Sequence, residues 1–257
     1  MGSELEIPKV IIERKNIANQ ILSKYSINPK SYDKLWVNFY EDYFLRFDGK
    51  DIAWHTRVLT PYFEKNKTII KVRHGSDGQG IEVLIFTKDA KALFAKITNF
   101  FYGMKFEVVQ ATITTTKNNY ALDVFNLIDI PSESISYKNY FQYIETELTK
   151  YLLNDNSELT IPKNKKTLQV THHEIDSQIT CRKIKTNRYQ LEVVCASRLN
   201  LLGIIVKEIN LLGMSVHNAK INTLGQRAED FFIISSKIKL NLEKRIQTLI
   251  KNIRLKV

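Results

Sequence analysis

The side chains best suited to chemistry are widely separated in this chain of 257 residues. His172, His173 and Cys181 come closest to a metal site, but neighbouring histidines on a strand point to opposite faces. No further Cys or His follows at the spacing of a zinc finger. Asp123 and Asp230 are suited to acid–base work as a pair, yet they occupy equivalent positions of a repeat, which favours a structural role.

Motifs for catalysis are missing from the sequence. It contains no phosphate-binding glycine loop and no G-x-S-x-G, H-E-x-x-H or C-x-x-C motif. His217, beside Asn218, fits a pocket or surface position better than that of a base. The segment DYFLRFDGKDIAWHTR, residues 42–57, leaves two interpretations open: His55 takes part in chemistry, or the segment has a role without chemistry.

Composition argues against several classes of protein. Hydrophobic residues make up 44% of the chain, but no apolar run reaches the ~20 residues of a membrane-spanning helix. The N-terminus lacks the pattern of a secretory signal, and the chain has 2 cysteines, which together favour the cytoplasm. The formal net charge is +11, with its lysines scattered singly along amphipathic segments. We therefore expect neither a nucleic-acid partner nor a membrane partner.

Hydrophobic periodicity predicts an α+β fold that begins with a helical segment. Helices are expected over 4–25, over 31–44, and from near Asp48 to about Pro61. Beyond them, the order strand, helix, strand, strand, helix occurs twice. The predicted strands are 67–74, 82–87, 106–116, 119–128, 168–175, 189–196, 214–224 and 226–236, and the predicted helices are 90–102, 137–153, 199–212 and 241–253.

An internal duplication connects the two halves of this pattern. They align at an offset of 108 residues (201 minus 93), and the A-x-I-x-T sequence of 111–115 recurs at 219–223. Each half fits the β-α-β-β-α-β ferredoxin-like arrangement, in which both helices cover one face of an antiparallel sheet. We expect the two units to pair, sheet edge to edge or face to face. The second unit is short of a last strand, which 168–175 could supply.

Two long segments resemble a known family. DYFLRFDGKDIAWHTR (42–57) and GMSVHNAKINTLGQRAEDFFIIS (213–235) are similar to the C-terminal part of the protein-PII uridylyltransferase/uridylyl-removing enzymes. The resemblance implies a helical connector followed by two tandem ACT domains. It divides the chain into a connector (1–63), ACT domain 1 (64–153), a linker with an extra strand (154–188) and ACT domain 2 (189–257).

The resemblance also implies partners outside this sequence. In the family, a nucleotidyltransferase domain uses UTP and Mg²⁺ to modify the signalling protein P-II, and an HD domain removes the UMP. Neither catalytic motif occurs here, so no cofactor is expected in this chain, and Mg²⁺ is expected only for the catalytic domains. These domains, P-II and the effector L-glutamine are the implied partners, with a homo-oligomer through the ACT domains as a further option.

The family relation gives the segment around His55 a role without catalysis. No His-Asp pair accompanies His55, so it is not the HD-domain histidine. We expect the segment to dock the ACT tandem onto the catalytic domains, through the side chains Tyr43, Phe44, Arg46, Trp54 and His55.

The expected glutamine site lies at the turn before the first helix of the second ACT domain. Family members carry D-x-P-G-L-L there, whereas this chain reads S-R-L-N-L-L. The loss of Asp, Pro and Gly weakens the prediction, although Asn tolerates the left-handed backbone conformation. The candidate ligand-binding residues are Ser197, Arg198, Leu199, Asn200, Leu201, His217 and Asn218. The alternative is a free-standing tandem ACT module that has lost amino-acid sensing.

Overall fold

The computed structural model describes residues 6–65, 67–75, 80–90, 92–129, 140–154, 175–185, 187–198, 201–236 and 241–257. The chain forms two compact units. The first unit consists of Met1–Lys71, Leu84–Asp89 and Thr114–Asp123. The second unit consists of Val72–Val83, Ala90–Ile113 and Val124–Val257. The domain boundaries expected at 63, 153 and 188 stay a prediction.

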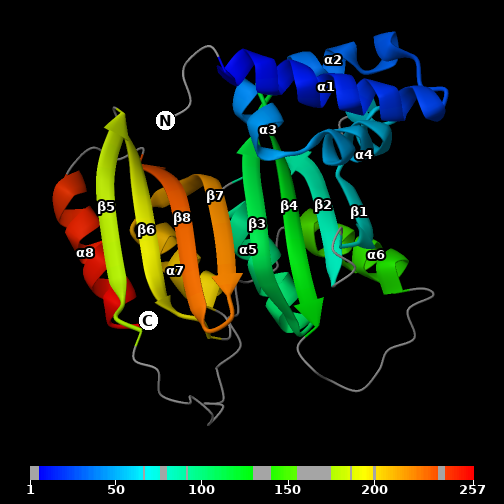
Figure 1. Ribbon diagram of the computed structural model, residues 1–257. Coiled ribbons are helices and arrows are strands. Elements are labelled where there is room, and N and C mark those ends of the chain that lie inside the picture. The colour runs from blue at the N-terminus through cyan, green and yellow to red at the C-terminus, as the bar shows by residue number, and fades with distance from the viewer. Residues whose placement is uncertain are drawn as a thin grey trace. The chain divides into compact units, whose positions relative to one another are not determined.

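The first unit begins with four helices (Figure 1), whereas the hydrophobic periodicity predicts three over the same residues. The predicted helix over 31–44 is in fact two helices, because Tyr40 is extended (φ −79°, ψ 160°). This break lets the ring of Phe39 pack 4.1 Å from that of Tyr43, inside an aromatic core. The helices are α1 (Glu6–Lys24), α2 (Asp33–Val37), α3 (Glu41–Arg46) and α4 (Gly49–Leu59), with short 3₁₀ turns at Pro29–Ser31 and Phe63–Lys65.

Helix α4 begins where the sequence predicts a third helix. The Asp48 Oδ1 atom accepts hydrogen bonds from the backbone N–H groups of Lys50 and Asp51, both at 2.8 Å, and so caps the helix. Gly49 allows a close approach of α1, because a Cβ atom at this position would lie 2.5 Å from the Cβ of Ile17. A helix-capping signal and a small residue together fix this end of the aromatic core.

Eight strands form one sheet in the order β1-β2-β4-β3-β7-β8-β6-β5. The pairs β3–β7, β7–β8, β6–β8 and β5–β6 are antiparallel. The strands are β1 (Ile69–His74), β2 (Ile81–Lys88), β3 (Phe106–Thr115), β4 (Tyr120–Asp129), β5 (Gln178–Lys185), β6 (Arg188–Ala196), β7 (Met214–Leu224) and β8 (Arg227–Ser236). The remaining helices are α5 (Leu93–Gly103), α6 (Tyr140–Leu153), α7 (Leu201–Leu211) and α8 (Leu242–Arg254).

The duplication predicted from the sequence is present in the fold. The series β2-α5-β3-β4-α6 recurs as β6-α7-β7-β8-α8, so the α+β class with two ferredoxin-like repeats is confirmed. The turns before α5 and α7 are held alike: Asp89 N–H donates to the Asn119 carbonyl (3.0 Å), and Ser197 N–H donates to the Gln226 carbonyl (2.7 Å).

The repeats join edge to edge through β3 and β7. This pairing is registered at three positions, with Ala111 opposite Ile221 at its centre. The sheet of the second repeat takes its outer strand from β5, which pairs with β6 and lies within the segment 154–188, predicted as a linker with an extra strand. The strand predicted over 168–175 falls almost entirely outside the described residues.

The core of the second unit lies between its strands and its helices. Figure 1 shows α5, α6, α7 and α8 on the same face of the sheet. Phe101, Phe125, Ile205 and Phe232 are fully buried there. Along β8, buried residues alternate with half-buried ones, so Asp230 points into the helix-covered face together with Phe232.

Candidate functional site

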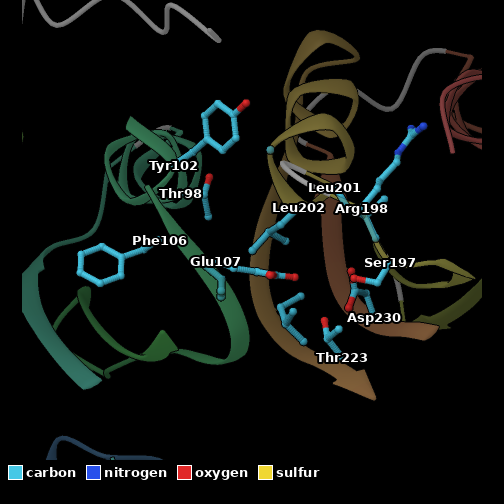
Figure 2. A pocket seen from close by; sticks show the side chains of 13 residues that line it. Thr98, Tyr102, Phe106, Glu107, Ser197, Arg198, Leu201, Leu202, Thr223 and Asp230 are labelled. Carbon is cyan, nitrogen blue, oxygen red and sulfur yellow. The ribbon is translucent and has the colours of Figure 1, made fainter. Parts of the chain in front are cut away.

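A pocket lies in the second unit, where side chains of the two repeats meet (Figure 2). The first repeat contributes side chains from α5 and β3, and the second contributes the turn before α7, α7 itself, β7 and β8. The cavity has a volume of about 40 Å³, which is room for a few water molecules. Its lining residues are Thr98, Tyr102, Phe106, Glu107, Val108, Ser197, Arg198, Leu201, Leu202, Gly203, Ile221, Thr223 and Asp230.

The turn expected to hold an amino acid contributes three of its five candidate residues to this pocket: Ser197, Arg198 and Leu201. Leu199 and Asn200 lie outside the described residues. In the first repeat, Ala92 occupies the place that corresponds to Asn200, and its backbone is left-handed (φ 60°). In the first repeat, Ala92 thus adopts a backbone conformation that asparagine tolerates well.

Two carboxyl groups face the pocket, and neither was predicted as a site residue. Asp230 is buried, and its Oδ1 accepts one long hydrogen bond from the backbone N–H of Asn222 (3.4 Å). Burial raises the pKa of Asp230 to about 7. Glu107 is half-buried on β3, and desolvation also raises its pKa. In the duplication, Glu107 corresponds to Ser215, and this departure from the repeat is the signal that could have singled it out.

His217 and Asn218 are not brought to this pocket. The His217 Nε2 atom hydrogen-bonds the Ser235 hydroxyl group. Asn218 pairs with Ile233. Ser235 and Ile233 alternate with the buried residues of β8, so both candidates lie on the face of the sheet opposite Asp230. The expectation that they join Ser197 and Arg198 around one ligand is therefore corrected.

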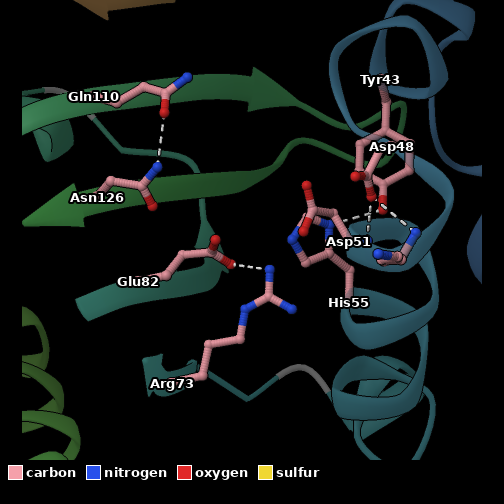
Figure 3. A network of polar contacts seen from close by, with 9 residues as sticks. Tyr43, Asp48, Asp51, His55, Arg73, Glu82, Gln110 and Asn126 are labelled. Atoms are coloured by element: carbon pink, nitrogen blue, oxygen red, sulfur yellow. Dashed lines mark hydrogen bonds and ion pairs between the residues drawn. The ribbon is translucent and has the colours of Figure 1, made fainter. Parts of the chain in front are cut away.

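The segment around His55 is largely interior to the first unit. Tyr43, Phe44 and His55 are at most 3% exposed. The Tyr43 hydroxyl group lies 3.0 Å from His55 Nδ1 (Figure 3). Arg46 pairs with a neighbouring aspartate on the same helix, and the Trp54 ring lies against His55. A docking role stays a prediction, but the three buried side chains cannot carry it by direct contact.

The candidate metal and acid–base groups are not assembled into a site. Within the described ranges, no three His, Cys, Asp or Glu side chains are placed to hold a metal ion. His172 and His173 lie outside these ranges. Burial raises the pKa of Cys181 to about 11, so the thiol stays protonated at neutral pH. Burial also raises the pKa of Asp123 well above its ordinary value.

The helical segment matches the family described as "Uridylyltransferase GlnD fifth domain" over residues 8–58, which include α2, α3 and most of α1 and α4.

No helix among the described residues has the length and apolar character needed to cross a membrane.

Curated relatives match most of the chain, and each is named a bifunctional uridylyltransferase/uridylyl-removing enzyme. The relative from Nitrosospira multiformis is 34% identical over 91% of this chain and 26% of its own length. The one from Thiobacillus denitrificans is 31% identical over 91% and 27%. The one from Haemophilus influenzae (strain PittEE) is 31% identical over 98% and 29%. The chain thus spans little more than a quarter of the length of these relatives.

Proposed function

We propose that this chain, which corresponds to the C-terminal part of a bifunctional uridylyltransferase/uridylyl-removing enzyme, is the region through which that enzyme senses glutamine. The observation that carries the proposal is the pocket at the junction of the two repeats. It is lined by Ser197, Arg198 and Leu201, from the turn at which ACT domains bind amino acids.

The position of the pocket supports a mechanism of regulation. Since both repeats line it, a ligand there contacts both repeats and favours one arrangement of them over others. A ligand that binds one state tenfold more tightly than another shifts the equilibrium by ~1.4 kcal/mol. Such a shift is enough to bias which of two catalytic activities predominates.

In the full-length enzyme, this region would act on catalytic domains that lie outside the sequence. We infer that these domains use UTP and Mg²⁺ to modify P-II and also remove the UMP. Glutamine bound to the ACT tandem would set the balance between the two activities, and thereby the signal that controls nitrogen assimilation.

Calorimetric titration of the purified chain with L-glutamine tests this function. Saturable binding is expected for L-glutamine, and much weaker binding for L-glutamate and L-histidine. Circular dichroism shows whether the protein is folded. A folded chain that gives no binding heat with L-glutamine would contradict glutamine sensing by this region.

The second candidate function is an interaction module that binds no amino acid. Two observations favour it: the cavity of about 40 Å³ is smaller than an amino acid, and the turn lacks the Pro and Gly of the family pattern. If glutamine binds, the side chains that line the pocket must therefore move apart. A crystal structure with L-glutamine would show this movement, whereas a module would keep the pocket closed.

A further inference from the structure

The two carboxyl groups of the pocket come from different repeats. Glu107 lies on β3 of the first repeat and Asp230 on β8 of the second. Figure 2 shows the Glu107 side chain pointing from β3 toward the side of the pocket on which Ser197 and Asp230 lie. The hydroxyl-bearing side chains of Ser197 and Thr223 line the pocket beside Asp230. This side of the pocket is thus rich in oxygen atoms.

In the part of the chain that the structure describes, neither carboxyl group is paired with a cation. Across the described residues, no ion pair involves Glu107 or Asp230. Arg198 also lines the pocket, but its side chain extends away from Asp230 (Figure 2). Carboxylates removed from water without a partner are costly, and buried ones are normally paired. A ligand with a positive group would supply the missing charge.

We propose that Glu107 and Asp230 together bind the α-ammonium group of the amino acid that this region senses. The inference rests on the proposed function and names the chemistry of recognition at the same pocket. Ammonium binding by Glu107 and Asp230 also explains how the site can bind an amino acid without the aspartate that the family pattern places at position 197. Here Ser197 stands at that position, and Glu107 from the other repeat supplies a carboxylate in its stead.

The charge of the lining also gives a basis for specificity. Glu107 and Asp230 oppose the single positive charge of Arg198, so the pocket favours ligands without an extra negative charge. L-glutamine carries one ammonium and one carboxylate, whereas L-glutamate carries a second carboxylate that these residues repel. Discrimination between the two amino acids is therefore expected to depend on the same carboxylates that bind the ammonium group.

The test compares L-glutamine with two analogues by calorimetry. One lacks the α-amino group (5-amino-5-oxopentanoic acid), and the other keeps the amino group but has its carboxylate blocked (L-glutaminamide). The proposal expects about tenfold or greater loss of affinity for the first analogue, because charge-assisted hydrogen bonds are lost. A smaller loss is expected for the second.

Matched variants assign the effect to the two residues. Glu107→Gln and Asp230→Asn should each weaken L-glutamine binding by about tenfold or more. Glu192→Gln is the control, because Glu192 pairs with Phe231 on the opposite face of the sheet. It should bind as the unmodified chain does. Thermal unfolding of all three variants tests whether they are folded. If Asp230→Asn misfolds, Glu107→Gln still tests the proposal, because Glu107 is only half-buried.

The outcomes separate the two proposals. If L-glutamine binds but the deaminated analogue binds equally well, or if Glu107→Gln and Asp230→Asn bind like Glu192→Gln, ammonium recognition is overturned while glutamine sensing stands. If the unmodified, folded chain does not bind L-glutamine, both proposals fail.

Discussion

The buried carboxyl group of Asp230 makes the stability of the chain depend on pH. Its pKa is about 7 in the folded protein, against an ordinary value of 3.8. The folded state therefore holds a proton that the unfolded state releases, and stability falls as pH rises through this interval. At ~1.36 kcal/mol for each pH unit, the ionised group costs about 4 kcal/mol at pH 8. At pH 5 the cost is smaller by about 2–3 kcal/mol.

Asp230→Asn isolates this cost. The amide keeps an oxygen that can accept the hydrogen bond from Asn222 N–H, but it does not ionise. The variant should therefore gain stability relative to the unmodified chain by about 2–3 kcal/mol between pH 5 and pH 8. Urea unfolding of both proteins at the two pH values measures the difference. Glu107 and Arg198 are present in both proteins, so their contributions cancel.

One outcome of this comparison would refute the prediction. If the difference in unfolding free energy between the two proteins is the same at pH 5 and pH 8, Asp230 does not titrate in this range in the folded state. Its carboxyl group would then be paired or hydrated, and the reasoning about an uncompensated charge in the pocket would be wrong.

Two further predictions concern the helices α1 to α4 of the first unit. Gly49→Ala should destabilise it by about 1–3 kcal/mol, since the new methyl group would lie 2.5 Å from the Cβ of Ile17. Gly103→Ala is the control, because no atom lies within 4 Å of its added Cβ; if both variants melt at the same temperature, the close packing of α1 on α4 is refuted. Tyr43→Phe removes the hydroxyl group 3.0 Å from His55 Nδ1 and should cost about 1–3 kcal/mol in urea unfolding, because a buried polar atom loses its partner. Unchanged stability would mean that this contact contributes nothing.

The fold was largely predictable because both the duplication and the hydrophobic period can be read directly from the sequence. The break at Tyr40 was not, because extended backbone there is favoured by packing of Phe39 on Tyr43, a tertiary contact. The extra strand of the second repeat was expected, but over 168–175 rather than at Gln178–Lys185, because the position of β5 depends on its pairing with β6, a tertiary contact.

The candidate site was predicted in part. The turn with Ser197 and Arg198 follows from the family pattern, and both residues line the pocket. His217 was misplaced because the pairing of β7 with β8 shifts between Val216 and Asn218. Such a bulge changes the face to which the side chains point, and nothing in the local sequence marks it. Glu107 was missed because it approaches from the other repeat.

The short pairing between β3 and β7 has a mechanical consequence. Three registered positions join the repeats there, whereas β6 and β8 are registered at nine, from Arg188 to Ala196. The β3–β7 pairing is thus expected to open at a lower free energy than the β6–β8 pairing. Amide hydrogens of the β3–β7 pairing should exchange with solvent sooner than those between β6 and β8. A ligand that contacts both Glu107 and Asp230 would connect the two repeats across the β3–β7 pairing and slow that exchange.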